Sequence, residues 1–223
     1  MMTTSSGHKV LPDIPEKTLK SYLSQKEIAV DTELEGLRLV RDQVALVQLC
    51  DRNQEVCLVR PDISNPPPNL TRFFTHPKTI KIFHYAISDV AFLKSSLGID
   101  VHPFRCTKVM SKLIRTYTDS HGLKHLVKEF IGLEMDKNAQ SSNWQRKDLT
   151  QEQLQYAAND VLYLLPVYDA LKRMLKERGK LPTGISAVEI NDHSQKMLIT
   201  MVELVLNGYG DRDQGWETSL FSH

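Results

Sequence analysis

Residues 27–60 read EIAVDTELEGLRLVRDQVALVQLCDRNQEVCLVR. Three runs in this stretch are rich in Val, Ile, Leu and Cys, namely EIAVDTE (27–33), QVALVQLC (43–50) and EVCLVR (55–60). Apolar runs of this length predict buried strands, and the short polar connections between them favour antiparallel pairing. The stretch therefore predicts that a β-sheet begins as a three-stranded antiparallel meander.

Two carboxylates interrupt the first predicted strand. Asp31 and Glu33 are two residues apart, so in a strand their side chains project from one face, while Val30 and Thr32 project from the other. Buried together, the two acids repel each other, and at least one takes up a proton unless a cation lies between them. If the strand ends at residue 31, both acids are solvated, which is the usual situation for an isolated Asp-x-Glu pattern. Residues elsewhere in the chain have to decide between these interpretations.

Beyond residue 60 the pattern changes to strands followed by helices. The pattern predicts strands at 78–85 and 99–103 and helices at 69–76, 86–98, 107–117, 122–132 and 149–179. The last helix starts with a capping box, Thr150 with Gln153, and Pro166 should kink it. A meander followed by strand–helix units is typical of an α/β domain with a mixed sheet.

Length and composition favour one main domain. The 223 residues are 41% hydrophobic and 25% charged, which is enough for one well-filled core. Clear periodicity is lost from about residue 181, so we expect a domain over residues 1–180 and a C-terminal extension, residues 181–223, that packs on it. No run reaches the ~18 consecutive apolar residues of a membrane span, and the N-terminal residues lack the pattern of a secretory signal. We therefore expect a cytoplasmic protein with no membrane association.

Two further acidic positions lie in apolar surroundings. Asp89 falls in FHYAISDVAFL (83–93), near the start of a predicted helix, where it is either a helix-start charge or a ligand that points into a site. Tyr156 and Asp160, in LQYAANDVLYLL (154–165), are four residues apart and share one face of a helix. The small and aliphatic residues around this pair predict near-complete burial, and a buried Tyr beside a buried Asp requires an explanation.

Together with Asp31 and Glu33 on the first predicted strand, Asp89 and Asp160 make four carboxylates on three separate segments, with no matching set of His or Cys ligands. Oxygen-only ligand sets are those that Mg²⁺ and Mn²⁺ prefer, and two such ions about 4 Å apart are the usual clamp for phosphodiester cleavage. The chemistry indicated is hydrolysis of a phosphate ester by a metal-bound water.

Three segments resemble the motifs of a known enzyme superfamily. VDTELEGL (30–37), FHYAISDVAFL (83–93) and YAANDVLYLLPVY (156–168) resemble the three motifs of the DEDD superfamily of 3′→5′ exonucleases. The tyrosine four residues before the last aspartate is similar to the tyrosine subclass, and within it the match is closest to the ribonuclease D family. Supporting matches are HGLKHLVKEFIG (121–132), SSNWQRKDLTQEQLQYAA (141–158) and GWETSLFSH (215–223). The last of these is similar to the ending of short, single-domain bacterial members.

The resemblance implies a ribonuclease H-like fold and a 3′→5′ exoribonuclease activity. Such an enzyme removes nucleoside 5′-monophosphates from single-stranded or frayed RNA 3′ ends, in RNA or tRNA processing or degradation. In that activity Tyr156 orients the attacking water, and two divalent ions, Mg²⁺ or Mn²⁺, are held by Asp31, Glu33, Asp89 and Asp160. Two alternatives stay open: the same chemistry directed at DNA, and a catalytically silent nucleic-acid-binding domain, which would be expected to lack at least one of these five residues. No obligate protein partner is evident.

The resemblance defines the substrate contacts less well. Cys106 stands where many members have an aspartate, and Gly36 is the only glycine in the turn after the first motif. We expect no C-terminal helical domains of the ribonuclease D type, so the basic segments 105–128 and 171–180 are candidates for contacts to the RNA backbone. Leu37 and Tyr85 either stack on the terminal base or belong to the core. The full set of candidate substrate-binding residues is Leu37, His84, Tyr85, Lys108, Arg115 and Lys124.

Overall fold

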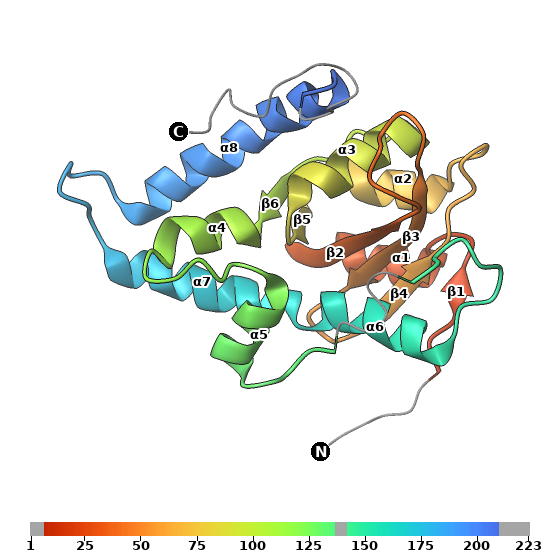
Figure 1. The fold of residues 1–223 in the computed structure, drawn as a ribbon, viewed down its shortest axis with the longest axis horizontal. Coiled ribbons are helices and arrows are strands. Elements are labelled where there is room, and N and C mark those ends of the chain that lie inside the picture. The colour runs from red at the N-terminus through yellow and green to blue at the C-terminus, as the bar shows by residue number, and fades with distance from the viewer. Residues whose placement is uncertain (1–6, 137–141, 210–223) are drawn as a thin grey trace.

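The computed structural model describes residues 7–136 and 142–209 and has an α/β architecture. Within these residues a six-stranded mixed sheet has the order β1-β4-β3-β2-β5-β6, with helices on both of its faces (Figure 1). The strands are β1 (Val10–Leu11), β2 (Glu27–Leu34), β3 (Val44–Cys50), β4 (Val56–Val59), β5 (Ile80–Phe83) and β6 (Phe104–Cys106). The helices are α1 (Glu16–Leu23), α2 (Pro68–Thr75), α3 (Ala86–Leu97), α4 (Thr107–Ile114), α5 (Leu123–Ile131), α6 (Gln151–Leu162), α7 (Leu164–Arg178) and α8 (Ala187–Leu206).

The predicted meander is confirmed. β2 pairs antiparallel with β3, and β3 pairs antiparallel with β4, whereas β5 lies parallel to β2, and β6 parallel to β5. The α/β class with a mixed sheet is therefore also confirmed. β2 has a neighbour on each side: β5 pairs with residues 27–29, and β3 pairs with the rest of the strand from Ala29 onward. This pairing holds the side chains of β2 in fixed directions.

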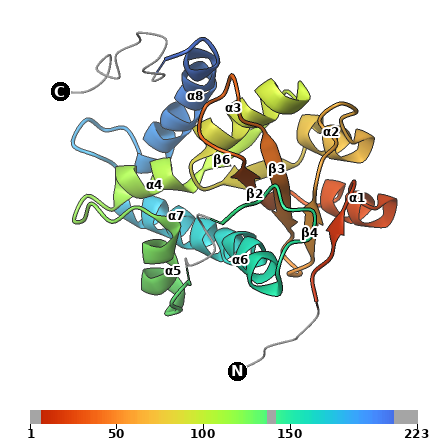
Figure 2. The same cartoon turned by 45° about the vertical axis from the view of Figure 1, so that its right-hand side comes forward.

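The alternation of side chains along β2 divides the interior into two layers. Ile28 and Val30 pack in one core cluster with residues of α1, α2, α3 and α8. Ala29 packs on the opposite face, in a cluster with residues of α4, α5 and α7. Figure 2 shows α6 and α7 in sequence along this second side of the sheet. Asp31 and Glu33 continue the odd-numbered series, so they face the α6 and α7 layer.

The long helix predicted over residues 149–179 is two helices. The capping box of Thr150 and Gln153 is present at the start of α6, as predicted. The interruption is at Tyr163, between α6 and α7, and it lies three residues before Pro166. Proline has no N–H, and its ring clashes with the carbonyl group four residues earlier, here that of Leu162, so α6 ends at that residue.

One local prediction was wrong, and two elements were missed. The strand expected at 99–103 is an extended segment that buries Ile99 and Val101, and pairing with β5 begins only at Phe104. Pro103 explains the delay, because it has no N–H to donate to a ladder. The elements α1 and β1 had not been predicted at all.

Residues 187–206 form α8, although no clear periodicity had been recognised after residue 181. A capping box between Ser186 and Glu189 starts the helix, and Leu198 and Val202 are buried in the same core cluster as α3. The inner face of α8 also carries the buried polar residues Asn191 and Gln195, which interrupt the apolar pattern. Residues 215–223, for which a resemblance to the ending of family members was noted, lie outside the described residues. Among the residues that are described, none of the helices has the length and apolar character needed to cross a membrane.

Candidate active site

β2 and α6 bring together the acids of the first and third predicted motifs. Carboxylate oxygens of Asp31, Glu33 and Asp160 all lie within 4.8 Å of one another. The two strand residues share a face of β2, and the small residues Ala157 and Ala158 let the backbone of α6 approach the sheet. The register of the β2–β3 ladder shifts directly after Glu33, as in a β-bulge, and such irregularities re-aim strands beside active sites. The three predicted carboxylates therefore converge from elements far apart in the sequence.

Asp89 reaches the same region from the first turn of α3, which follows β5. The Thr32 hydroxyl donates a 2.6 Å hydrogen bond to Oδ1 of Asp89, between β2 and α3. Asp89 is not part of the group of three oxygens, but its charge contributes to raising the pKa of Asp31. The role of Thr32 was missed in the sequence, because a hydroxyl on the opposite face of β2 acquires a partner only when α3 packs there.

Burial and mutual repulsion raise the pKa values of these acids. Burial, followed by the charges of the neighbouring acids, places the pKa of Asp31 well above its usual range and that of Glu33 at about 9. Burial raises the pKa of Asp89 to about 7, although the hydrogen bond from Thr32 acts in the opposite direction. Crowded carboxylates of this kind can be ionised together only beside a cation. An all-oxygen, strongly negative donor set fits Mg²⁺ or Mn²⁺, so the residues present fit the predicted metals.

Tyr156 lies one turn before Asp160 on α6, on the same face of the helix. Burial and the nearby acids raise the pKa of the phenol far above its usual value, so it stays protonated at neutral pH. The Trp144 ring lies 6.0 Å from the Tyr156 ring, at an angle of 40°. This buried indole, which we had not singled out in the sequence, fixes the direction of the tyrosine. Tyr156 is thus a rigid, neutral hydrogen-bonding group beside the acids.

Three predicted substrate-binding residues meet at the junction of α3 and α4. Tyr85 is half exposed and adopts φ 101° at the start of α3, a left-handed conformation that is unfavourable for a side chain of this size. Lys108 places its Nζ 4.2 Å from the centroid of the Tyr85 ring. Nδ1 of His84 lies 2.9 Å from Oγ1 of Thr107, which itself donates to the Phe83 carbonyl. This rim, formed by His84, Tyr85 and Lys108, lies on the chain segments next to Asp89.

The other three candidates lie elsewhere. Leu37 is 87% exposed in the connection between β2 and β3, and Lys124 is half-buried on α5. Arg115 is only 1% exposed, and its guanidinium donates to the Ser120 carbonyl at 2.7 Å and to the Glu129 carboxylate. Because these contacts occupy its donors inside the fold, we treat Arg115 as a structural residue and leave it out of the substrate surface.

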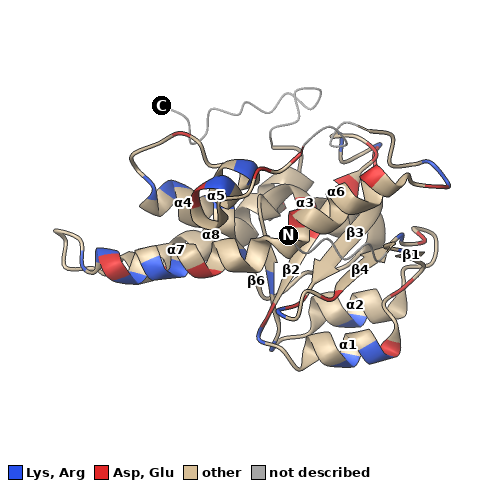
Figure 3. Cartoon of the chain, turned by 90° about the horizontal axis from the view of Figure 1, so that it is seen from below, with Lys and Arg blue, Asp and Glu red and all other residues tan. Residues whose placement is uncertain are grey.

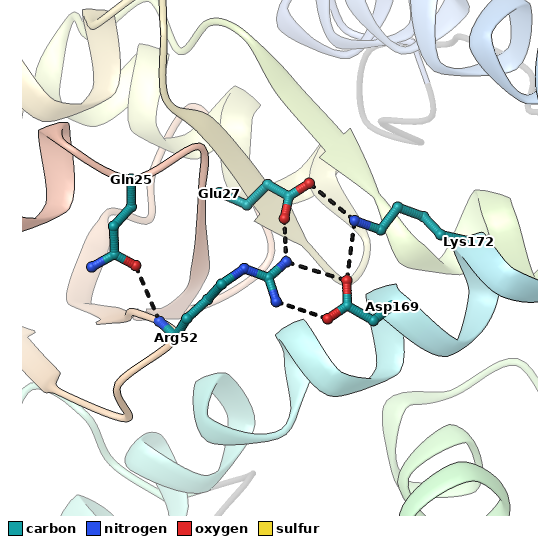
Figure 4. Close-up of polar contacts among 5 residues, drawn as sticks. All are labelled: Gln25, Glu27, Arg52, Asp169 and Lys172. Atoms are coloured by element: carbon teal, nitrogen blue, oxygen red, sulfur yellow. Dashed lines mark hydrogen bonds and ion pairs between the residues drawn. The ribbon is translucent and has the colours of Figure 1, made fainter.

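An ion-pair network also engages part of the basic segment 171–180. Lys172 on α7 pairs with Glu27 at 3.1 Å and with Asp169 at 3.0 Å, and Arg52 pairs with the same two acids (Figure 4). The network fastens α7 to the start of β2, the strand that carries Asp31. The ammonium group of Lys172 is therefore engaged in ion pairs within the fold.

Comparison with known proteins identifies the family. Residues 12–176, most of the chain, match the model of a family described as 3′-5′ exonuclease. The chain belongs to this 3′-5′ exonuclease family. The resemblance to the DEDD exonucleases and ribonuclease D seen in the sequence is thereby confirmed.

Relatives of this exonuclease include ribonuclease D of Haemophilus influenzae, which is 32% identical over 155 residues, 70% of this chain and 38% of the relative. The chain spans 18% to 42% of the length of the first five curated relatives. Among solved structures, a nuclease in its apo form has a TM-score of 0.85 and 35% identity, with 97% of this chain and 98% of that one covered.

NrnC of Brucella melitensis has been solved with bound Mg²⁺ and bound to pGG. Its pGG complex has a TM-score of 0.81 and 33% identity, with 96% of this chain and 95% of that one covered. The Mg²⁺ form has a TM-score of 0.80 and 32% identity, with coverage of 97% and 96%. These likenesses confirm the predicted ribonuclease H-like fold of the exonuclease.

Proposed function

We propose that this exonuclease hydrolyses single-stranded RNA from its 3′ end and releases nucleoside 5′-monophosphates. We further propose that Asp31, Glu33, Asp89 and Asp160 hold two divalent ions, Mg²⁺ or Mn²⁺. The observation that carries the proposal is the approach of three carboxylates from β2 and α6 to within 4.8 Å of one another. An RNA substrate is supported by the ribonuclease D relative and by the NrnC structure bound to pGG.

The metal-holding role divides between a rigid strand and two helices. When bound, divalent ions would stabilise charge on the scissile phosphate and lower the pKa of the attacking water. Asp31 and Glu33 are paired with β3, and β5 pairs with the start of the same strand, so their carboxylates are oriented before any ion arrives. Thr32 orients Asp89 in the same way, through its hydroxyl.

Tyr156 is the residue that orients the attacking water. Its phenol is neutral, because burial and the surrounding acids raise its pKa, and so it acts as a hydrogen-bonding group rather than as a base. Packing against Trp144 holds the ring in place. The nucleophile is thereby placed beside the same acids that hold the metals, which is the advantage of having Tyr156 and Asp160 on one face of α6.

The rim beside Asp89 supplies contacts to the RNA. The half-exposed Tyr85 ring offers a stacking surface for a base, and the Lys108 ammonium group offers a charge for a phosphate. Lys and Arg residues are also distributed over α4, α5 and α7 (Figure 3), and among them Lys112 and Lys128 are exposed. A basic surface of this kind suits the backbone of a longer strand.

The proposal is tested with matched RNA and DNA oligonucleotides that carry a 5′ label, together with pGG, in Mg²⁺ or Mn²⁺. We expect the RNA to shorten one nucleotide at a time from its 3′ end and to yield nucleoside 5′-monophosphates. Excess chelator and the Asp160→Asn variant serve as controls that should stop the reaction. Hydrolysis that continues in chelator would refute the metal-dependent mechanism, and faster cleavage of the DNA would assign the chemistry to DNA instead.

A further inference from the structure

Gln48 is a buried polar residue that the fold leaves without an explanation. Its side chain on β3 is 0% exposed, and neither of its amide atoms has a hydrogen-bond partner within the part of the chain that the structure describes. A buried amide that makes no hydrogen bond destabilises a protein, and such groups are rare in native structures. Gln48 therefore carries an energetic disadvantage that a leucine or methionine at this position would avoid.

The β2–β3 ladder places Gln48 directly opposite Asp31. Residues opposite each other in an antiparallel pair share a face and have Cβ atoms about 4.5–5.5 Å apart, so a glutamine side chain can reach its neighbour's carboxylate. On its other side Gln48 faces Leu58, and Leu46 and Ala157 belong to the apolar cluster over the same part of the sheet. An uncharged donor is thus positioned beneath an acid of the active site, in otherwise apolar surroundings.

We propose that Gln48 is a positioning residue for Asp31, whose amide Nε2 donates a hydrogen bond to the Asp31 carboxylate when that carboxylate binds a divalent cation. The proposal rests on the proposed function, because it assumes that Asp31 is a metal ligand. Groups that hydrogen-bond a ligating carboxylate hold it in the direction that the metal requires. A neutral amide does so without offering a positive charge that would compete with the metal.

The decisive variant is Gln48→Met, which keeps the length of the side chain and removes the amide. If Gln48 positions Asp31, this variant has a melting temperature about 2–4 °C higher in chelator, because an unpartnered polar group is gone. The same variant binds Mn²⁺ about tenfold more weakly, because Asp31 is less well oriented. A buried amide with no role at Asp31 would raise the melting temperature in the same way but leave the Mn²⁺ affinity unchanged, so the affinity decides between the two cases.

Gln195→Met is the matched control. Gln195 is a buried glutamine of α8, and its amide makes hydrogen bonds to the backbone N–H and carbonyl of Cys106, at 2.7 Å and 3.1 Å. Loss of these bonds lowers the melting temperature, and the affinity for Mn²⁺ stays that of the original chain. The two glutamine variants are therefore expected to move in opposite directions in stability, with only one of them changed in metal binding.

The measurements are calorimetric titration with Mn²⁺, thermal unfolding in chelator, and separate kcat and KM values on RNA. For Gln48→Met we expect kcat to fall at limiting metal and to recover at high metal, with KM for RNA unchanged. Unchanged Mn²⁺ affinity, or a lower melting temperature in chelator, would overturn the role of Gln48 while leaving the hydrolysis by the original chain intact. Weaker Mn²⁺ binding by Gln48→Met, in a chain that hydrolyses no RNA, would uphold this role and refute the proposed function instead.

Discussion

The acidic side chains at the two ends of β2 differ in whether the protein supplies positive charge beside them. At its start, Glu27 is 5% exposed and is balanced by Arg52 and Lys172. Toward its end, Asp31 and Glu33 face two further carboxylates, and no Lys or Arg among the described residues forms an ion pair with either of them. The acid of the first cluster is balanced by side chains of the protein, whereas the second cluster is the one that we propose to hold divalent ions. This difference separates a structural charge network from the proposed catalytic one, although both lie on one face of one strand.

The largest expected effect comes from the same chemical change made at both ends. Asp31→Asn should lower kcat about 10³-fold or more, because a metal ligand is lost, and should stabilise the metal-free protein, because one repelling charge is removed. Glu27→Gln should leave kcat within about twofold and destabilise the protein by about 1–2 kcal/mol, a value reduced for the partial exposure of Arg52. Activity assays and urea unfolding in chelator measure both quantities. Equal signs of the two stability changes would contradict the comparison.

Tyr156→Phe tests the tyrosine without altering the metal ligands. We expect kcat to fall about 10²-fold, because the hydroxyl that orients the water is absent, while Mn²⁺ affinity is retained. Single-turnover hydrolysis and calorimetric titration give the two values. Tyr168→Phe, which alters a tyrosine of α7 beside Lys172, is the matched control and should leave kcat unchanged. A Tyr156→Phe enzyme with full activity would remove the tyrosine from the mechanism.

Thr32→Val tests whether the hydrogen bond from β2 to α3 positions Asp89. The substitution keeps the shape of the side chain and removes the 2.6 Å bond, so we expect about a tenfold loss of kcat and about 1 kcal/mol of stability. Thr32→Ser keeps the hydroxyl and should retain most of the activity. If the serine variant loses as much activity as the valine variant, packing rather than the hydrogen bond is what Thr32 contributes.

A further expected effect is a dependence of stability on pH. In the unfolded chain these carboxyls ionise near pH ~4, whereas in the folded protein the pKa of Asp89 is about 7 and that of Glu33 about 9. Between these values the folded state binds more protons than the unfolded state, so the stability of the metal-free protein falls as the pH rises from about 5 to 9.

Melting temperatures measured in chelator across that range check this prediction. Saturating Mn²⁺ should flatten the slope, because it favours the ionised carboxylates, and Glu27→Gln should leave the slope in place. A stability that increases with pH in chelator would mean that a cation of the protein already neutralises the acids.

Much of the fold and the identity of the acids could be predicted from local patterns. The apolar runs of residues 27–60 predicted β2, β3 and β4 and their antiparallel order, and the alternation along β2 placed Asp31 and Glu33 on one face. α8 was not predicted, because a helix packed against several others carries buried polar residues such as Gln195 that break the apolar stripe. Periodicity reports which face is buried only when that face is uniformly apolar.

What the sequence by itself determined is the set of candidate residues: four carboxylates, a tyrosine four residues before the last of them, and a strand that carries two of the acids. Only the tertiary structure decided which polar and charged residues are engaged in contacts inside the fold. It buries Arg115 against Glu129 and pairs Lys172 with Glu27, and it joins Thr32 to Asp89. The physical reason is that a residue's type and neighbours in the chain set what it can bind, whereas its actual partner depends on contacts between segments far apart in sequence.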